Sequence, residues 1–173
     1  HLGLAAARCN NVPTYPHNTE RALQHVLDIS QSRAVIVSTA KLALNVMPAV
    51  VRSSEAEFVI GIEPLKITQK GQQSIHDWAD LVQGTDADVL ALSADMAAVG
   101  RDETACIIYT SGTGGAPRGV MLHHGSILCN VEGAGEILRD DFGLIDDRFL
   151  SFLPLSHAYE HSGGQFLPIG CGA

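Results

Sequence analysis

The sequence predicts an α/β layered sandwich with a mostly parallel sheet. Helical and strand patterns alternate along the chain, and β-branched runs at 34–38 and 58–62 are typical of buried strands. Apolar residues make up 46% of the 173 residues and charged ones 17%, as in ordinary globular proteins. The chain is therefore long enough for one domain with a core of its own.

The first half of the chain carries this alternation clearly. Residues 2–8 are typical of the tail of a helix, and two prolines keep 12–16 extended, since each disfavours the helical region for the residue before it. Asn18 or Thr19 can cap a helix that ends near Ser30. A strand at 34–38, a helix through about residue 52 and a strand at 58–62 are expected to follow.

The second half is less regular. Ile75, Trp78, Leu81 and Val82 recur at helical spacing and predict a helix near 74–83, whereas 86–100 fits either a helix or a loop. Strands are expected at 105–109, 120–122 and 149–153, with a helix from about 125 to 138.

Charge and cysteine content argue against several classes of protein. The formal net charge is −8, and the 11 basic residues are scattered, so neither a nucleic-acid face nor a polybasic membrane patch is expected. No apolar run approaches the roughly 20 residues of a spanning helix. The four cysteines are far apart without a CxxC pair, which favours reduced thiols in a cytoplasmic protein over disulfides or a zinc site.

The strongest local signal is a glycine- and hydroxyl-rich stretch at 110–119, directly after a predicted strand. Glycines let backbone N–H groups turn toward an anion, while hydroxyls and an arginine add donors. The stretch fits neither a Walker A loop nor a dinucleotide-binding G-x-G-x-x-G. A plain flexible connection between two strands is the alternative. The candidate phosphate-binding residues are Thr110, Ser111, Gly112, Thr113, Gly114, Gly115 and Arg118.

Residues 109–119, which read Y-T-S-G-T-G-G-A-P-R-G, resemble the Y-T-S-G-T-T-G-x-P-K-G signature of adenylate-forming enzymes. This family includes acyl- and aryl-CoA synthetases and luciferases, and its loop closes over the β- and γ-phosphates of ATP. The chain departs from the signature at Gly114, where the family has Thr, and at Arg118, where it has Lys. Arginine keeps the charge, whereas Gly114 removes a hydroxyl and raises the entropy cost of ordering the loop.

A second stretch at 149–160, F-L-S-F-L-P-L-S-H-A-Y-E, is similar to a segment of the long-chain fatty acyl-CoA synthetases. The resemblance implies a catalytic role for His157 and an acyl pocket lined by His157 and Tyr159. His161 lies four residues on, but the order of an H-E-x-x-H zinc helix is absent, so no metal site is expected and His161 is interpreted as an ordinary polar helix residue. His124 is interpreted as structural or helix-capping.

The resemblance implies ATP-dependent activation of a fatty acid to an acyl-adenylate and then to acyl-CoA. ATP, Mg²⁺ and coenzyme A would take part, with small molecules as the partners. Peripheral membrane association and self-association through an exposed sheet edge are both compatible with the sequence. Another adenylating ligase, acting as a fatty acyl-AMP or aryl-CoA ligase, stays open, as does a nucleotide-binding module without catalysis.

The resemblance also implies that residues 1–173 are a fragment of the large N-terminal ATP- and acyl-binding domain, with the C-terminal domain absent. The family's Y-G-x-T-E magnesium motif does not occur in the sequence, and its C-terminal catalytic lysine has no counterpart. The 173 residues alone are therefore expected to be inactive.

Overall fold

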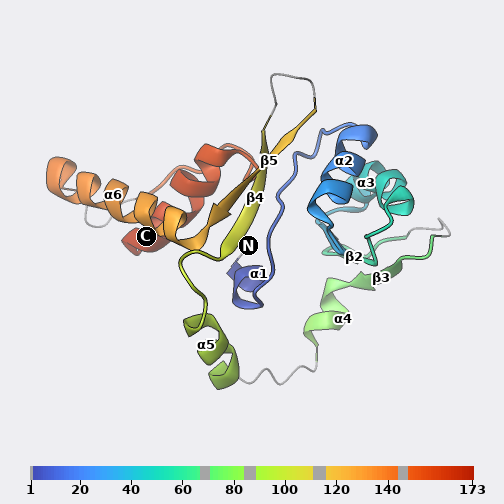
Figure 1. Ribbon diagram of the computed structural model, residues 1–173, viewed down its shortest axis with the longest axis horizontal. Helices are drawn as coiled ribbons and strands as arrows, with labels where there is room; N and C mark the ends of the chain where they lie inside the picture. The colour runs from blue at the N-terminus through green and yellow to red at the C-terminus, as the bar shows by residue number, and fades with distance from the viewer. Residues whose placement is uncertain (1, 67–70, 84–88, 111–115, 144–147) are drawn as a thin grey trace. The chain divides into compact units, whose positions relative to one another are not determined.

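The computed structural model describes residues 2–66, 71–83, 89–110, 116–143 and 148–173, which form two compact units (Figure 1). The three-strand unit consists of residues 16–88 and 109–119. The α6 unit consists of residues 1–15, 89–108 and 120–173 and contains the longest helix.

The three-strand unit is built on a parallel sheet of order β1-β2-β3. Ala34 lies opposite Phe58 in the first pair of strands, and Phe58 lies opposite Ser74 in the second. Helices alternate with these strands, so the predicted α/β class with a parallel sheet is confirmed. The elements of this unit are α2 (Glu20–Ser30), β1 (Ala34–Val37), α3 (Ala40–Arg52), β2 (Phe58–Gly61), β3 (Ser74–Asp77) and α4 (Trp78–Val82).

Two threonines fix the starts of the helices in this unit. The Thr19 hydroxyl accepts a hydrogen bond from the Ala22 N–H at 3.3 Å, and the Thr39 hydroxyl accepts one from the Leu42 N–H at 3.2 Å. Each satisfies a donor that the first turn of a helix would otherwise leave unpaired.

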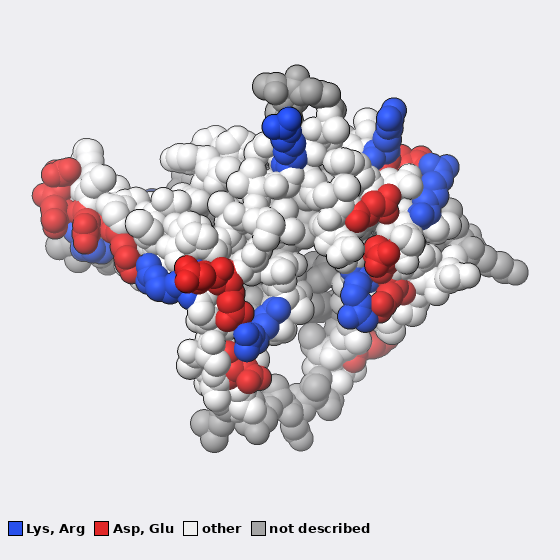
Figure 2. Space-filling view, viewed as in Figure 1, with Lys and Arg blue, Asp and Glu red and all other residues white. Residues whose placement is uncertain are grey.

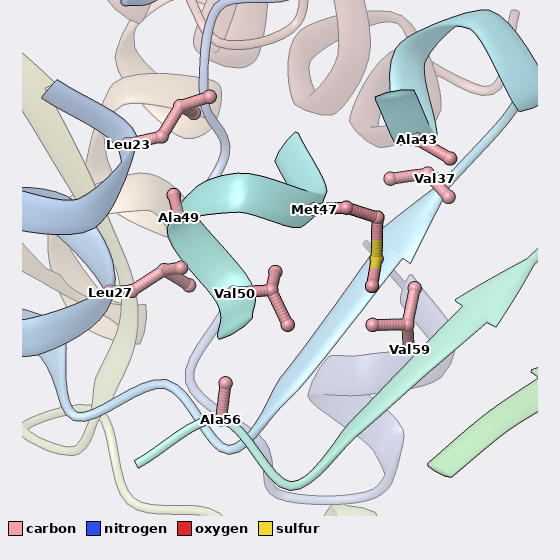
Figure 3. Close-up of a cluster of buried hydrophobic side chains, with 9 residues drawn as sticks. All are labelled: Leu23, Leu27, Val37, Ala43, Met47, Ala49, Val50, Ala56 and Val59. Carbon is pink, nitrogen blue, oxygen red and sulfur yellow. The ribbon is translucent and has the colours of Figure 1, made fainter. Parts of the chain in front are cut away.

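One face of α2 and of α3 packs with the sheet to form the core of the three-strand unit (Figure 3). In the close-up, Met47 of α3 points toward β2, where Val59 lies. The buried cluster consists of Leu23, Leu27, Val37, Ala43, Met47, Ala49, Val50, Ala56 and Val59.

The α6 unit has a smaller core, made by the inward side of β4 and the start of α6. Ala105, Cys106 and Ile108 pack against Ile127. Asn11 pairs with this strand as an isolated bridge, its N–H donating to the Ala105 carbonyl at 3.3 Å. The helices of this unit are α1 (Leu2–Ala6), α5 (Val89–Ala97), α6 (His124–Phe142), the π-helix η1 (Glu160–Phe166) and α7 (Leu167–Cys171). The strands β4 (Thr104–Thr110) and β5 (Arg118–His123) pair with each other and lead from one unit into the other.

Several predicted elements were wrong in part. The expected helix at 74–83 begins as β3, because Ser74–Asp77 pairs with β2, and only Trp78–Val82 is helical. Residues 149–153 form no strand, since no described strand pairs with them, and the side chains of Leu150 and Phe152 are 82% and 70% exposed. The undecided stretch 86–100 contains the helix α5.

Of the two interpretations of His124, the helix-capping one was wrong, because another residue caps α6. The ring Nδ1 of His123 accepts the Ser126 N–H at 3.0 Å, so His123 is the N-cap and His124 is the first helical residue. The His124 backbone N–H instead donates to the Glu103 carbonyl at 3.0 Å.

Charged side chains show no broad basic patch on the face drawn in Figure 2, where most basic groups lie close to acidic ones. Acidic side chains follow α6, whose sequence holds four carboxylates. Among the described helices, none has both the length and the apolar character needed to cross a membrane.

Candidate active site

The predicted phosphate loop connects β4 to β5. Thr110 is the last residue of β4 and Arg118 the first of β5, and both side chains are exposed. Arg118 forms no ion pair with any described carboxylate. The residues between them that were predicted to bind phosphate lie outside the described part of the chain: Ser111, Gly112, Thr113, Gly114 and Gly115.

Helix α2 contacts the chain on both sides of this loop through His25, a residue that the sequence did not single out. The His25 Nε2 lies 3.0 Å from the Pro117 carbonyl oxygen. Because a carbonyl only accepts, this nitrogen carries a hydrogen and donates it. The same imidazole meets the Tyr109 ring edge-on, with the ring centroids 6.4 Å apart. One half-buried histidine therefore touches the residue before Thr110 and the residue before Arg118.

Tyr109, directly before Thr110, is a buried residue that anchors the start of the loop. It is 8% exposed, and burial raises the pKa of its phenol, while a hydrogen bond with Ser30 at the end of α2 opposes that rise. The phenol therefore stays neutral at physiological pH, and its ring packs edge-on against His25 of α2.

The second predicted motif forms a tight turn that leads into η1. The His157 N–H donates to the Pro154 carbonyl at 2.8 Å, and the Tyr159 N–H donates to the His157 Nδ1 at 3.2 Å. Since Nδ1 accepts a hydrogen bond, the neutral ring carries its proton on Nε2. Both His157 and Tyr159 are exposed, which suits contact with a ligand.

Glu160, the last residue of the motif, and His161, which follows it, are deeply buried polar residues. Each is 1% exposed. Burial lowers the pKa of His161, and its ring lies 4.9 Å from that of Phe166. The interpretation of His161 as an ordinary polar helix residue was therefore wrong, because η1 turns it into the protein interior. Glu160 was not predicted as a functional residue.

The two motifs belong to different units. Thr110 and Arg118 flank a loop of the three-strand unit, while His157 and Tyr159 belong to the α6 unit. Within the described ranges, no cluster of three or more His, Cys, Asp or Glu side chains could hold a metal ion. The polar groups that the described residues of the two motifs offer to a ligand are hydroxyl, guanidinium and imidazole donors.

Known proteins resemble this chain over nearly its whole length. A family model described as AMP-binding enzyme matches residues 1–173. A long-chain-fatty-acid–[acyl-carrier-protein] ligase of Arabidopsis thaliana is 29% identical over 180 residues, covering 98% of this chain and 24% of the relative. Long-chain-fatty-acid–CoA ligase 1 of Saccharomyces cerevisiae is 28% identical and covers 92% of this chain and 25% of the relative. The chain thus spans about a quarter of the length of these curated relatives.

Solved structures show the same fold. A luciferase from Phrixothrix hirtus superposes with a TM-score of 0.69 at 20% identity, over 98% of this chain and 31% of the luciferase. A benzoate CoA ligase from Burkholderia xenovorans gives a TM-score of 0.63 at 21% identity, over 99% of this chain and 30% of the ligase.

Proposed function

This chain belongs to the family of AMP-binding enzymes, and we propose that it is the N-terminal-domain part of a longer ligase that activates fatty acids with ATP. In the proposed reaction a fatty acid carboxylate attacks the α-phosphorus of ATP and releases pyrophosphate. The thiol of coenzyme A then attacks the acyl carbon of the acyl-adenylate and displaces AMP. The longer protein is called the complete ligase below.

The observation that carries this proposal is the position of the 110–118 loop. Its described ends belong to two paired strands, carry an exposed hydroxyl and an exposed guanidinium, and are contacted by His25 through Tyr109 and Pro117. Donors held in place before the reaction stabilise developing charge without a reorganisation cost. We assign Thr110 and Arg118 to the leaving pyrophosphate, together with the loop residues 111–115.

His157 is assigned to the acyl carboxylate. Its Nε2–H can donate to a carboxylate oxygen while Nδ1 stays bound to the Tyr159 N–H. A neutral N–H donor of this kind orients the attacking carboxylate oxygen without transferring a proton to it. Tyr159, 66% exposed, offers an apolar ring beside it for the acyl chain.

Two acceptor thiols are compatible with the relatives. One relative is named as a ligase for an acyl carrier protein and another as a ligase for CoA. The second step therefore has two candidate acceptors of the acyl group, the thiol of an acyl carrier protein and that of coenzyme A. The four cysteines are free thiols, in keeping with the proposed cytoplasmic location.

The proposal is tested by giving the complete ligase ATP, Mg²⁺ and a panel of short, long and aromatic acids, with either coenzyme A or an acyl carrier protein as acceptor. We expect thioester formation with long-chain acids. Thioester only with aromatic acids would identify an aryl ligase, and acyl-adenylate without any thioester an acyl-AMP ligase. The 173-residue chain by itself should form no acyl-CoA, and detectable product would refute the proposed need for further residues.

A further inference from the structure

Glu160 is a carboxylate buried at the first position of η1, where no role in the proposed reaction requires a charge. It is 1% exposed, and its Oε2 accepts the Leu153 N–H at 3.4 Å. Its Oε1 has no hydrogen-bond partner among the described residues. Burying a carboxylate with so few partners costs free energy, so a structural benefit must offset this cost.

The hydrogen bonds around Glu160 show what that benefit is. The bond from Leu153 ties the beginning of the turn to its end, seven residues later. His157 lies inside this closed segment and is held three times: its N–H donates to Pro154, its Nδ1 accepts from Tyr159, and its carbonyl accepts from His161 at 2.9 Å. Glu160 thus closes the segment that fixes both the position and the tautomer of His157.

Gly164, one turn further along η1, leaves the space that the carboxylate occupies. A Cβ built at Gly164 would overlap the Glu160 carboxylate, with Oε1 as its nearest atom. A Cβ at the neighbouring Gly163 would make only an ordinary contact, 3.5 Å from the Tyr159 ring. Neither glycine has a positive φ, so the difference between them is steric and not conformational. π-helical turns of this kind are frequent at functional sites.

We propose that Glu160 is a positioning residue for His157, and that the lack of a side chain at Gly164 leaves the room that the Glu160 carboxylate needs for this role. The buried carboxylate closes the 153–160 turn and thereby keeps the His157 proton on Nε2, directed at the acyl carboxylate. This inference rests on the proposed function for the identity of the ligand, but the effect of Glu160 on His157 does not depend on it.

The matched pair Gly164→Ala and Gly163→Ala tests this in the complete ligase. The Gly164 variant displaces the Glu160 carboxylate, and a shift of His157 by about 1 Å is expected to lower kcat/KM for the acid on the order of 100-fold. Affinity for ATP should not change, because the loop at 110–118 is untouched. The Gly163 variant should behave as wild type in both measurements.

A spectroscopic readout separates this effect from simple damage. In protein labelled with ¹⁵N-histidine, the ring nitrogen shifts of His157, assigned with a His157→Gln variant, report which nitrogen carries the proton. We expect the Nε2–H tautomer in the wild type and in Gly163→Ala, and a mixture of tautomers in Gly164→Ala.

Substitutions of Glu160 itself keep the proposal testable if Gly164→Ala does not fold. Glu160→Gln retains an oxygen that accepts the Leu153 N–H and should keep the tautomer and most activity, whereas Glu160→Ala should lose both. Wild-type behaviour of folded Glu160→Ala or Gly164→Ala, or equal damage by Gly163→Ala, would overturn the proposal. A wild-type ligase without acid-dependent activity would overturn the proposed function, while the tautomer would still decide the role of Glu160.

Discussion

His25 provides the sharpest test of how the phosphate loop is held. Replacing it with alanine removes the hydrogen bond to the Pro117 carbonyl, 3.0 Å from Nε2, and the edge-on contact with the Tyr109 ring. A net hydrogen bond contributes about 1 kcal/mol, and an edge-on ring pair contributes about 0.5–1.5 kcal/mol beyond its buried area. Both contacts keep the ends of the loop in place before ATP arrives.

We therefore expect His25→Ala to raise the Kd for ATP. If the lost contacts make the ordering of the loop on ATP binding about 1–2 kcal/mol more costly, the affinity for ATP becomes roughly 5- to 30-fold weaker. Isothermal titration of the complete ligase with ATP measures this directly. His25→Gln, whose amide N–H can still reach the carbonyl, should lie between the alanine variant and the wild type.

His17→Ala is the matched control, because His17 is exposed and lies in the same unit just before α2. It should leave ATP affinity unchanged. If folded His25→Ala binds ATP as tightly as the wild type, His25 does not hold the loop for ATP. A raised KM for the acid with unaltered ATP affinity would contradict this role as well.

Three further predictions concern stability and reactivity. Met47→Ala, at a 2% exposed core position, should lower the free energy of unfolding by about 2–5 kcal/mol in denaturant titrations, whereas Leu44→Ala, 69% exposed on the same helix, should change it little. Burial raises the pKa of the Cys106 thiol to about 11, so iodoacetamide at pH 8 should label the exposed cysteines of the native chain and reach Cys106 only after unfolding; rapid labelling of Cys106 in the native chain would contradict this. The pKa of Glu103 is lowered, mainly by the hydrogen bond from the Gly100 N–H and next by the one from Arg8. The contribution of Glu103 to stability is therefore present above the unfolded pKa of about 4.3 and is lost as pH falls through the folded pKa. Glu103→Gln should therefore lower the unfolding midpoint at pH 7 but not at pH 2, and an equal loss at both would contradict the assignment.

Much of the three-strand unit could be predicted from the sequence because its signals are local. Thr19 caps α2 as a threonine before an apolar-periodic helix should, and the β-branched run at 34–37 forms β1. The β3 strand escaped prediction because Ile75 fits the helical spacing of Trp78 and Leu81. Only pairing with β2, a non-local interaction, makes Ser74–Asp77 extended.

The motifs themselves could be identified from residue types, but the residues that support them could not. Nothing in the spacing of α2 marks His25, whose partners lie at Tyr109 and Pro117, more than 80 positions away. Glu160 was visible only as part of a resemblance, because its burial depends on the π-helical turn and on the absence of a side chain at Gly164. The roles of Thr110, Arg118, His157 and Tyr159 in binding ligands stay predictions.

Carboxylate-dependent exchange of pyrophosphate into ATP by the complete ligase tests the proposed function most directly, since exchange requires reversible formation of an acyl-adenylate. We predict exchange that depends on a long-chain acid and falls by about 10²–10³ in Arg118→Ala, which removes the exposed cation at the end of the loop. ATP binding without exchange for any carboxylic acid would contradict the account and identify a nucleotide-binding protein that does not form an acyl-adenylate.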